Sequence, residues 1–142
     1  MVIIALGVWA YGISKTTDEK EPLGTVVQSI KGCYAATLSK DVYTINIASQ
    51  TGENFSGTLS FKNFEKDSSS GSYAGTYKNE ILLGTYSFES EGMHSEMDVV
   101  FKKTKDGFVR GFGDMNTTGE KFVDVGKITY DSTYTFRPIS CE

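Results

Sequence analysis

The chain has 142 residues, which is enough for one domain with a hydrophobic core. Charged residues make up 23% and hydrophobic residues 39%, a balance that excludes a disordered chain and a polytopic membrane protein. The net charge is −4, and the 14 lysines and arginines are scattered, so nucleic-acid binding is excluded as well.

The N-terminal residues differ in kind from the rest. Residues 2–13 (VIIALGVWAYGI) are almost all apolar, but the run is shorter than the roughly 20 residues of a membrane-spanning helix. Its length suits the hydrophobic region of a secretory signal, although no Lys or Arg precedes it. A signal peptide, a short membrane anchor and a buried first strand all stay open. We assign residues 1–14 to a hydrophobic leader or membrane anchor and residues 15–22 to a polar tether.

Residues 23–142 read as one β-domain. Apolar side chains alternate with polar ones over residues 41–48 and again over 55–61, and such alternation indicates half-buried strands. Further strands are expected at 72–78, 81–90, 97–101, 108–115 and 133–141, with a less regular stretch at 122–130. Asp106-Gly107 is the strongest hairpin signal, because a type I′ turn needs two residues that tolerate positive φ.

This pattern predicts about eight or nine strands, joined mostly by short turns. An up-and-down antiparallel β-barrel of about eight strands accounts for it, and closure of the barrel removes exposed strand edges. A two-sheet sandwich is the alternative. Glycines inside the predicted strands are expected at bends or where two backbones come close: Gly57, Gly75, Gly84, Gly111 and Gly113.

The only two cysteines lie at opposite ends of this β-domain, Cys33 at its first strand and Cys141 one residue from the C-terminus. A bond between them would tie the first strand to the last and would place the domain outside the reducing cytoplasm. Two free buried thiols are the alternative. We predict the disulfide, and with it an extracytoplasmic location in the periplasm, in the cell envelope or outside the cell.

The surroundings of the single histidine in the sequence give little indication of a metal site or of catalysis. His94 lies near Glu91 and Glu96, which would make a weak metal site, and a solvated hairpin explains the same residues more simply. A nucleophile elbow of the form Gly-x-Ser-x-Gly is absent from the sequence. We therefore predict a protein that is not an enzyme, and we assign no catalytic residue, no metal ligand and no cofactor.

Two groups of residues are candidates for binding. Barrels of about eight strands are filled by side chains or hold one small ligand, and tyrosine is an amphipathic lining residue. Aromatic residues predicted to face the interior are therefore candidate ligand contacts, with a packed core as the alternative: Tyr43, Tyr73, Tyr77, Tyr86 and Phe88. A polar loop offers Lys66, Asp67 and Ser70 to a ligand or partner, with a plain surface loop as the alternative.

Several strand-and-turn patterns resemble a group of small exported bacterial proteins without assigned function. They are residues 32–34 (GCY), 41–45 (DVYTI), 66–71 (KDSSSG), 83–93 (LGTYSFESEGM) and 101–103 (FKK), within about residues 31–115. The start of the domain is also similar to lipocalin- and avidin-like barrels, which begin with a Gly-x-aromatic strand. The resemblance implies a barrel and carries over no catalytic residue.

The sequence thus predicts a non-enzymatic extracytoplasmic binding module, associated with the cell envelope, for a small ligand or a partner protein. The N-terminal segment would provide any attachment to a membrane. The alternative is a structural or inhibitor-like envelope protein with a filled barrel, which acts through its surface loops.

Overall fold

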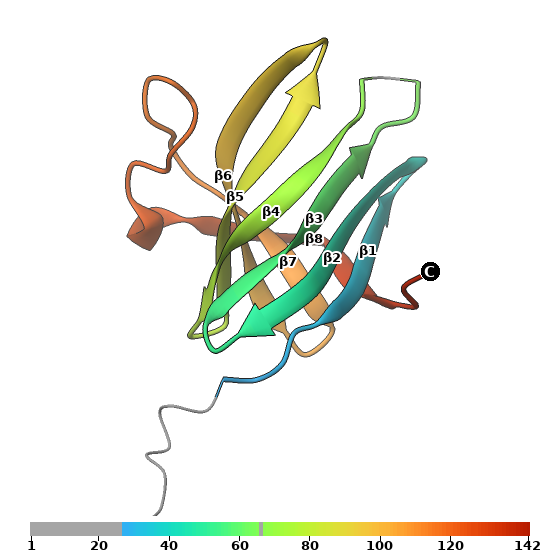
Figure 1. The fold of residues 1–142 in the computed structure, drawn as a ribbon, viewed down its shortest axis with the longest axis vertical. Helices are drawn as coiled ribbons and strands as arrows, with labels where there is room; N and C mark the ends of the chain where they lie inside the picture. The colour runs from blue at the N-terminus through green and yellow to red at the C-terminus, as the bar shows by residue number, and fades with distance from the viewer. Residues whose placement is uncertain (1–26, 66) are drawn as a thin grey trace, which may run out of the picture.

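The computed structural model of the chain describes residues 27–65 and 67–142. These residues form a closed barrel in which each strand pairs with the next and the last returns to the first (Figure 1). The predicted all-β antiparallel barrel is confirmed, and the predicted leader and tether lie outside the described residues. The elements are β1 (Gly32–Leu38), β2 (Asp41–Thr51), β3 (Asn54–Lys62), β4 (Ser69–Lys78), β5 (Ile81–Ser90), β6 (Met93–Thr104), β7 (Gly107–Phe112), the 3-10 turn η2 (Val125–Lys127) and β8 (Thr129–Ile139).

Tight turns set the register of neighbouring strands. Asn79 and Glu80 have φ values of 53° and 66°, as the central residues of a type I′ turn require, and they join β4 to β5. Tyr77 then pairs with Leu82, and both side chains face the barrel interior.

The turn between β6 and β7 differs from the prediction by one residue. Thr104 pairs with Gly107, so Lys105 and Asp106 form the turn and Gly107 is already the first residue of β7. Gly107 has a φ of 146°, and a Cβ atom there would lie 1.9 Å from the carbonyl oxygen of Phe136. The glycine is therefore required by close contact between β7 and β8 rather than by a type I′ turn.

Inside the barrel, glycine makes room for aromatic rings. Gly84 on β5 faces inward, where a Cβ atom would lie 2.9 Å from ring atoms of both Phe55 and Tyr73. This explains why one predicted strand glycine lies beside the largest side chains of the core.

The middle of the barrel is filled. Four aromatic side chains with 0% exposure form what we call the sealed core: Tyr73, Phe101, Phe108 and Phe136. Their rings meet edge to face, at 5.2 Å between Phe101 and Phe136 and 5.9 Å between Tyr73 and Phe101, a favourable geometry for aromatic pairs. The Tyr73 hydroxyl donates a hydrogen bond of 2.7 Å to the carbonyl oxygen of Val99, so this buried polar group is satisfied.

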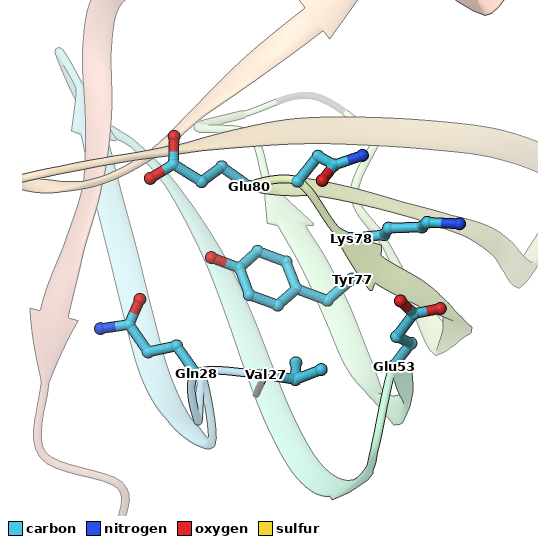
Figure 2. A pocket seen from close by; sticks show the side chains of 7 residues that line it. Val27, Gln28, Glu53, Tyr77, Lys78 and Glu80 are labelled. Carbon is cyan, nitrogen blue, oxygen red and sulfur yellow. The ribbon is translucent and has the colours of Figure 1, made fainter. Parts of the chain in front are cut away.

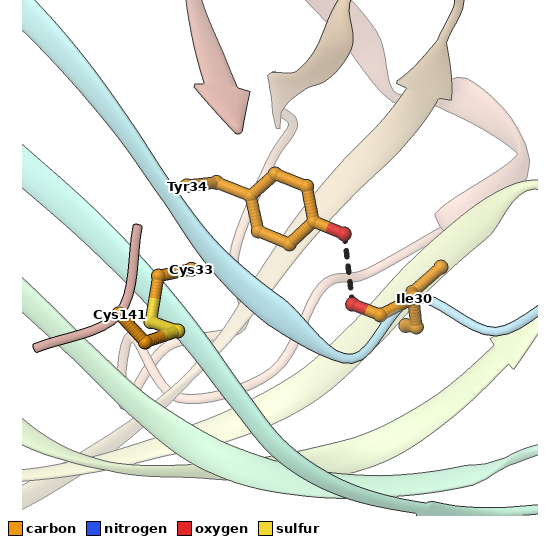
Figure 3. Close-up of a disulfide and its surroundings, with 4 residues drawn as sticks. All are labelled: Ile30, Cys33, Tyr34 and Cys141. Carbon is orange, nitrogen blue, oxygen red and sulfur yellow. Dashed lines mark hydrogen bonds between the residues drawn. A yellow bond between two sulfur atoms is a disulfide. The ribbon is translucent and has the colours of Figure 1, made fainter. Parts of the chain in front are cut away.

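The predicted bond between Cys33 and Cys141 is confirmed (Figure 3). Cys33 lies on β1 and pairs with Ile139 at the end of β8, so the bond fixes the junction of the first and last strands. The cysteines are 108 residues apart; if the bond acts by restricting the unfolded chain, a loop of this length contributes about 4–5 kcal/mol. Beside it, the Tyr34 hydroxyl donates to the carbonyl oxygen of Ile30 at 2.8 Å (Figure 3).

The connection between β7 and β8 is longer and less regular than predicted, because β7 already ends at Phe112 and β8 begins at Thr129. The connecting segment packs on the outer face of β6. Asp98 donates its backbone N–H to the carbonyl oxygen of Glu120 at 2.8 Å, and its carboxylate accepts from the N–H of Phe122 at 3.3 Å. Within the described part of the chain, no helix is long and apolar enough to span a membrane.

Candidate functional site

The charged side chain of Arg110 extends toward the aromatic rings of the barrel. Arg110 on β7 is two residues after the buried Phe108, and its guanidinium carbon lies 5.1 Å from the ring centre of Phe61 on β3 and 5.0 Å from that of Phe112. Because β3 and β7 are separated by three strands on either side of the closed barrel, the side chain crosses the interior. We call this group the arginine cluster: Arg110 with Tyr43, Phe61, Tyr86, Phe112 and Tyr134.

The charge of Arg110 has no acidic partner among the described residues. None of the four ion pairs found there includes it, and its Nε atom is buried without a hydrogen-bond partner. Asp131 is its neighbour across the β7–β8 ladder, but the Asp131 carboxylate accepts from the backbone N–H of Thr133 at 2.8 Å. A guanidinium has five N–H donors, and aromatic faces attract its charge without accepting those hydrogen bonds in full.

Two features of the surroundings shift the pKa of Arg110 in opposite directions. Burial lowers the pKa of Arg110, and nearby tyrosines, Tyr134 foremost, oppose that decrease. Burial likewise raises the pKa of Tyr134, and the positive charge of Arg110 opposes that increase. Arginine remains protonated at any physiological pH, so the barrel holds a permanent cation beside neutral tyrosines.

Most tyrosine hydroxyls of the arginine cluster are already used. Tyr43 donates to the side-chain oxygen of Asn63 at 3.0 Å, and Tyr86 donates to the hydroxyl of Ser69 at 2.9 Å. Among the described residues, Tyr134 makes no comparable hydrogen bond through its hydroxyl; its ring lies 5.9 Å from that of Tyr43. The donors that remain available are therefore those of Arg110 and the hydroxyl of Tyr134.

A bulge in β8 places Tyr134 beside Arg110. Phe108 pairs with Phe136 and Arg110 with Asp131, so residues 132–135 of β8 lie opposite a single residue of β7. Bulges of this kind bend a strand and redirect its side chains, and they are frequent near functional sites. Here the bulge lets Tyr134 pack against the core.

The same bulge opens a depression in the barrel wall. β1 and β8 pair at only three positions, from Cys33–Ile139 to Ala35–Arg137, and a hollow of about 640 Å³ lies along this junction and the bulge. We call it the seam depression; it is lined by Ala35 and Thr37 of β1 and by β8 residues 132–135 and 137–139. Tyr134 belongs both to this lining and to the arginine cluster, so it is the residue that the hollow and the cluster share.

A second pocket lies at the other end of the barrel. The Tyr77 pocket has a volume of about 300 Å³ and is lined by turn and strand-end residues: Val27, Gln28, Glu53, Tyr77, Lys78, Asn79 and Glu80. Figure 2 shows the ring of Tyr77 in the middle of these side chains, with its hydroxyl directed toward the side where Gln28 and Glu80 lie. Two carboxylates and one ammonium group surround it, and burial together with Glu80 raises the pKa of Tyr77.

The five aromatic residues predicted as ligand contacts separate into three places. Tyr43 and Tyr86 belong to the arginine cluster, and Phe88 stacks on Tyr86 with ring centres 4.6 Å apart. Tyr73 lies in the sealed core, and Tyr77 lines the pocket at the opposite end. The structure therefore brings three of the five together, and their role in binding remains a prediction.

The predicted loop site is partly described. Lys66 lies outside the described residues, Asp67 accepts a hydrogen bond from the Asn63 side chain through its backbone carbonyl at 2.8 Å, and Ser70 is exposed at the start of β4. Ser70 lines a hollow of about 330 Å³ with Lys62 and Glu89.

The histidine lies on an open hairpin. His94 contacts the hydroxyl of Ser87 at 3.0 Å and the carboxylate of Glu89 at 3.3 Å, and its side chain is 56% exposed. Among the described residues, no group of three or more His, Cys, Asp or Glu side chains is placed to hold a metal ion.

Arg110 was not among the residues singled out from the sequence, although a signal for it exists. In Gly107–Phe112 (GFVRGF), Arg110 alternates in phase with Phe108 and Phe112, and period two places all three side chains on one face of the strand. A charged residue on an apolar face is the sequence sign of a buried polar group. Comparison with protein-family models, with curated proteins and with solved structures gave no match to this chain.

Proposed function

We propose that this chain is an extracytoplasmic β-barrel binding module, and that a small molecule binds in its seam depression next to the arginine cluster. The observation that carries the proposal is the shared residue Tyr134, which lines a hollow of about 640 Å³ and also packs against the core as part of the arginine cluster. Small-molecule sites are concave and combine apolar side chains with a few polar groups that fix the orientation of the ligand.

The proposal includes an extracytoplasmic location for the protein. The disulfide is consistent with an oxidising compartment, because such bonds persist outside the reducing cytoplasm. The apolar residues 1–14 would serve as a leader or would attach the domain to the cell envelope. The resemblance to small exported bacterial proteins supports the same location.

The second candidate, action through surface loops, has one observation in its favour. Three large apolar residues of β7 and the following segment are exposed, with Phe112 at 45%, Val123 at 67% and Val125 at 56%. Exposed apolar side chains of this kind suit contact with a partner protein. In this candidate the barrel is a rigid support, and no small molecule enters the seam depression.

A neutral fluorescent probe, N-phenyl-1-naphthylamine, tests the first candidate. It would be titrated into the disulfide-bonded full chain and into two variants that each place a large ring in one pocket. Thr37→Trp fills the seam depression from an exposed position of β1, and Lys78→Trp is the matched control, an exposed strand residue lining the Tyr77 pocket.

We expect the probe to bind the unmodified chain with one site, and Thr37→Trp to weaken binding about tenfold or more, because the indole occupies the hollow. Lys78→Trp should change the affinity less than about twofold. Loss of binding in Lys78→Trp alone would move the site to the Tyr77 pocket. No binding by any of the three proteins would contradict a small-molecule site and would favour action through the loops.

A further inference from the structure

We propose that the ligand of the seam depression is a small organic carboxylate, whose anionic group is held by the guanidinium of Arg110 and the hydroxyl of Tyr134. This inference rests on the proposed function and names the chemical class of its ligand. It starts from the state of Arg110, a partly buried cation whose Nε atom is buried and has no hydrogen-bond partner among the described residues.

The first step is energetic. Moving a charged group out of water costs several kcal/mol unless other groups compensate, and proteins usually pair such charges or bond them fully. Arg110 has two aromatic faces, Phe61 and Phe112, at about 5 Å, which attract the cation without accepting its five N–H groups. A bound anion would supply the missing acceptors.

The second step concerns the choice of anion. A guanidinium is a planar fork of donors, and a carboxylate matches it with two parallel hydrogen bonds. The rings of Phe61 and Phe112 lie about 5 Å from the guanidinium carbon, and an aromatic ring does not accept the N–H groups as a carboxylate does. A neutral hydroxyl at Tyr134 adds a further donor, since the pKa of Tyr134 is raised by its burial.

The third step concerns the absence of competing charge. Three acidic residues influence this region, and each has a partner of its own: Asp41, Asp98 and Asp131. Asp41 accepts from the N–H of Phe64 at 2.7 Å and from the Tyr43 hydroxyl at 3.5 Å. Asp131 accepts from Thr133, and Asp98 interacts with Lys121 and the backbone of Phe122 on the outer face of β6. An incoming carboxylate would therefore meet Arg110 without displacing an internal partner.

The body of the ligand would lie in the seam depression. Ala35, Pro138 and Ile139 give its wall an apolar part, and Thr37, Thr135 and the exposed cation Arg137 give a polar part. The ligand reaches Arg110 when the Tyr134 side chain moves aside, and the bulged segment 132–135 that carries it pairs with neither neighbouring strand. A flat apolar body that ends in a carboxylate fits this arrangement.

Two isosteric probes test the inference without any mutation. 2-Naphthoate and 2-naphthamide have nearly the same shape, and only the first is charged. Titrated into the disulfide-bonded full chain, 2-naphthoate should bind at least about tenfold more tightly than 2-naphthamide, as a charge-assisted hydrogen-bonded pair requires.

Variants then assign the preference to its residues. Arg110→Gln should abolish the difference between the two probes, and Arg110→Lys should keep part of it, because the charge remains and the fork is lost. Tyr134→Phe should weaken 2-naphthoate about threefold to tenfold and leave 2-naphthamide unchanged, because only one hydroxyl is removed. Lys102→Gln, which removes an exposed positive charge on β6, is the control and should leave both affinities unchanged. Urea unfolding of each variant verifies that it is folded.

The outcomes separate this inference from the proposed function. Equal affinities for the two probes, with N-phenyl-1-naphthylamine still bound at the seam depression, would overturn the carboxylate and leave the binding module standing. A preference for 2-naphthoate that persists in Arg110→Gln would overturn the role of Arg110. Failure of all three probes to bind would overturn both proposals.

Discussion

The sealed core and the arginine cluster lie in one barrel and both contain aromatic rings, but they differ in burial and in how their polar groups are bonded. In the sealed core every ring is fully buried, and the one hydroxyl, that of Tyr73, is bonded to a backbone carbonyl. In the arginine cluster the rings are partly exposed or face a cation, and the buried Nε of Arg110 has no hydrogen-bond partner within the described part of the chain. The first arrangement leaves no hydrogen-bonding group of its rings unsatisfied, and the second includes a donor without a partner among the described residues.

The difference shows where the barrel departs from a purely structural design. Evolution can fill a barrel with neutral side chains, as it does here between β4 and β8, so an unpaired arginine is not needed to hold the strands together. A functional site that contains polar groups without partners commonly makes the folded protein less stable. Three measurements on the protein test whether the two regions differ in this way.

The largest effect should come from truncating one ring in each region. Phe101→Ala removes a fully buried side chain that contacts three other rings, and the cavity should lower the free energy of unfolding by about 3–5 kcal/mol. Phe61→Ala in the arginine cluster should cost about 1–2 kcal/mol, because Phe61 is only half-buried. Urea unfolding of the oxidised proteins measures both values. Equal losses would mean that the arginine cluster is as much a part of the core as Phe101.

Alkaline pH should also distinguish the two regions. Burial raises the pKa of Tyr73 well above 10.0, whereas the unfolded chain ionises this phenol near 10.0. Above that pH the unfolded state binds fewer protons than the folded state, so stability falls as the pH rises, by about 1 kcal/mol per pH unit until the folded pKa is reached. Below pH 10 the group contributes no such slope.

The control for this pH effect is a pair of Tyr→Phe variants, measured by urea unfolding from about pH 9 to about pH 11. Tyr73→Phe should make the alkaline decline shallower. Tyr134→Phe should change it less, because the charge of Arg110 opposes the increase in the pKa of Tyr134. A larger effect from Tyr134→Phe would show that the two tyrosines have been assigned to the wrong environments.

Much of the fold follows from local patterns in the sequence. Period-two alternation identified the strands, and cysteines at both ends of the β-region identified the disulfide, because each signal depends on residues close in sequence or on a pairing with no competitor. The turn at Lys105–Asp106 was displaced by one residue, because the need for Gly107 comes from the backbone of Phe136, which only the closed barrel brings near.

The candidate site was harder to predict for a related reason. Inward-facing aromatic residues could be listed from their phase, but whether they meet depends on the tilt of the strands and on the bulge in β8. That is why Tyr43 and Tyr86 meet beside Arg110, whereas Tyr77 lies at the opposite end of the barrel. The bulge at residues 132–135, which places Tyr134, has no clear local sequence signal.

The smallest change in stability is the most direct test of the central claim, that Arg110 is kept for a ligand at the expense of stability. Arg110→Met replaces the unpaired guanidinium by an unbranched apolar side chain, and the free energy of unfolding without ligand is measured in urea. We expect the variant to be more stable by about 1 kcal/mol, because a partly buried cation whose Nε has no hydrogen-bond partner among the described residues is replaced by an apolar side chain. A variant less stable by about 2 kcal/mol or more would show that Arg110 holds the barrel together, and would contradict the account.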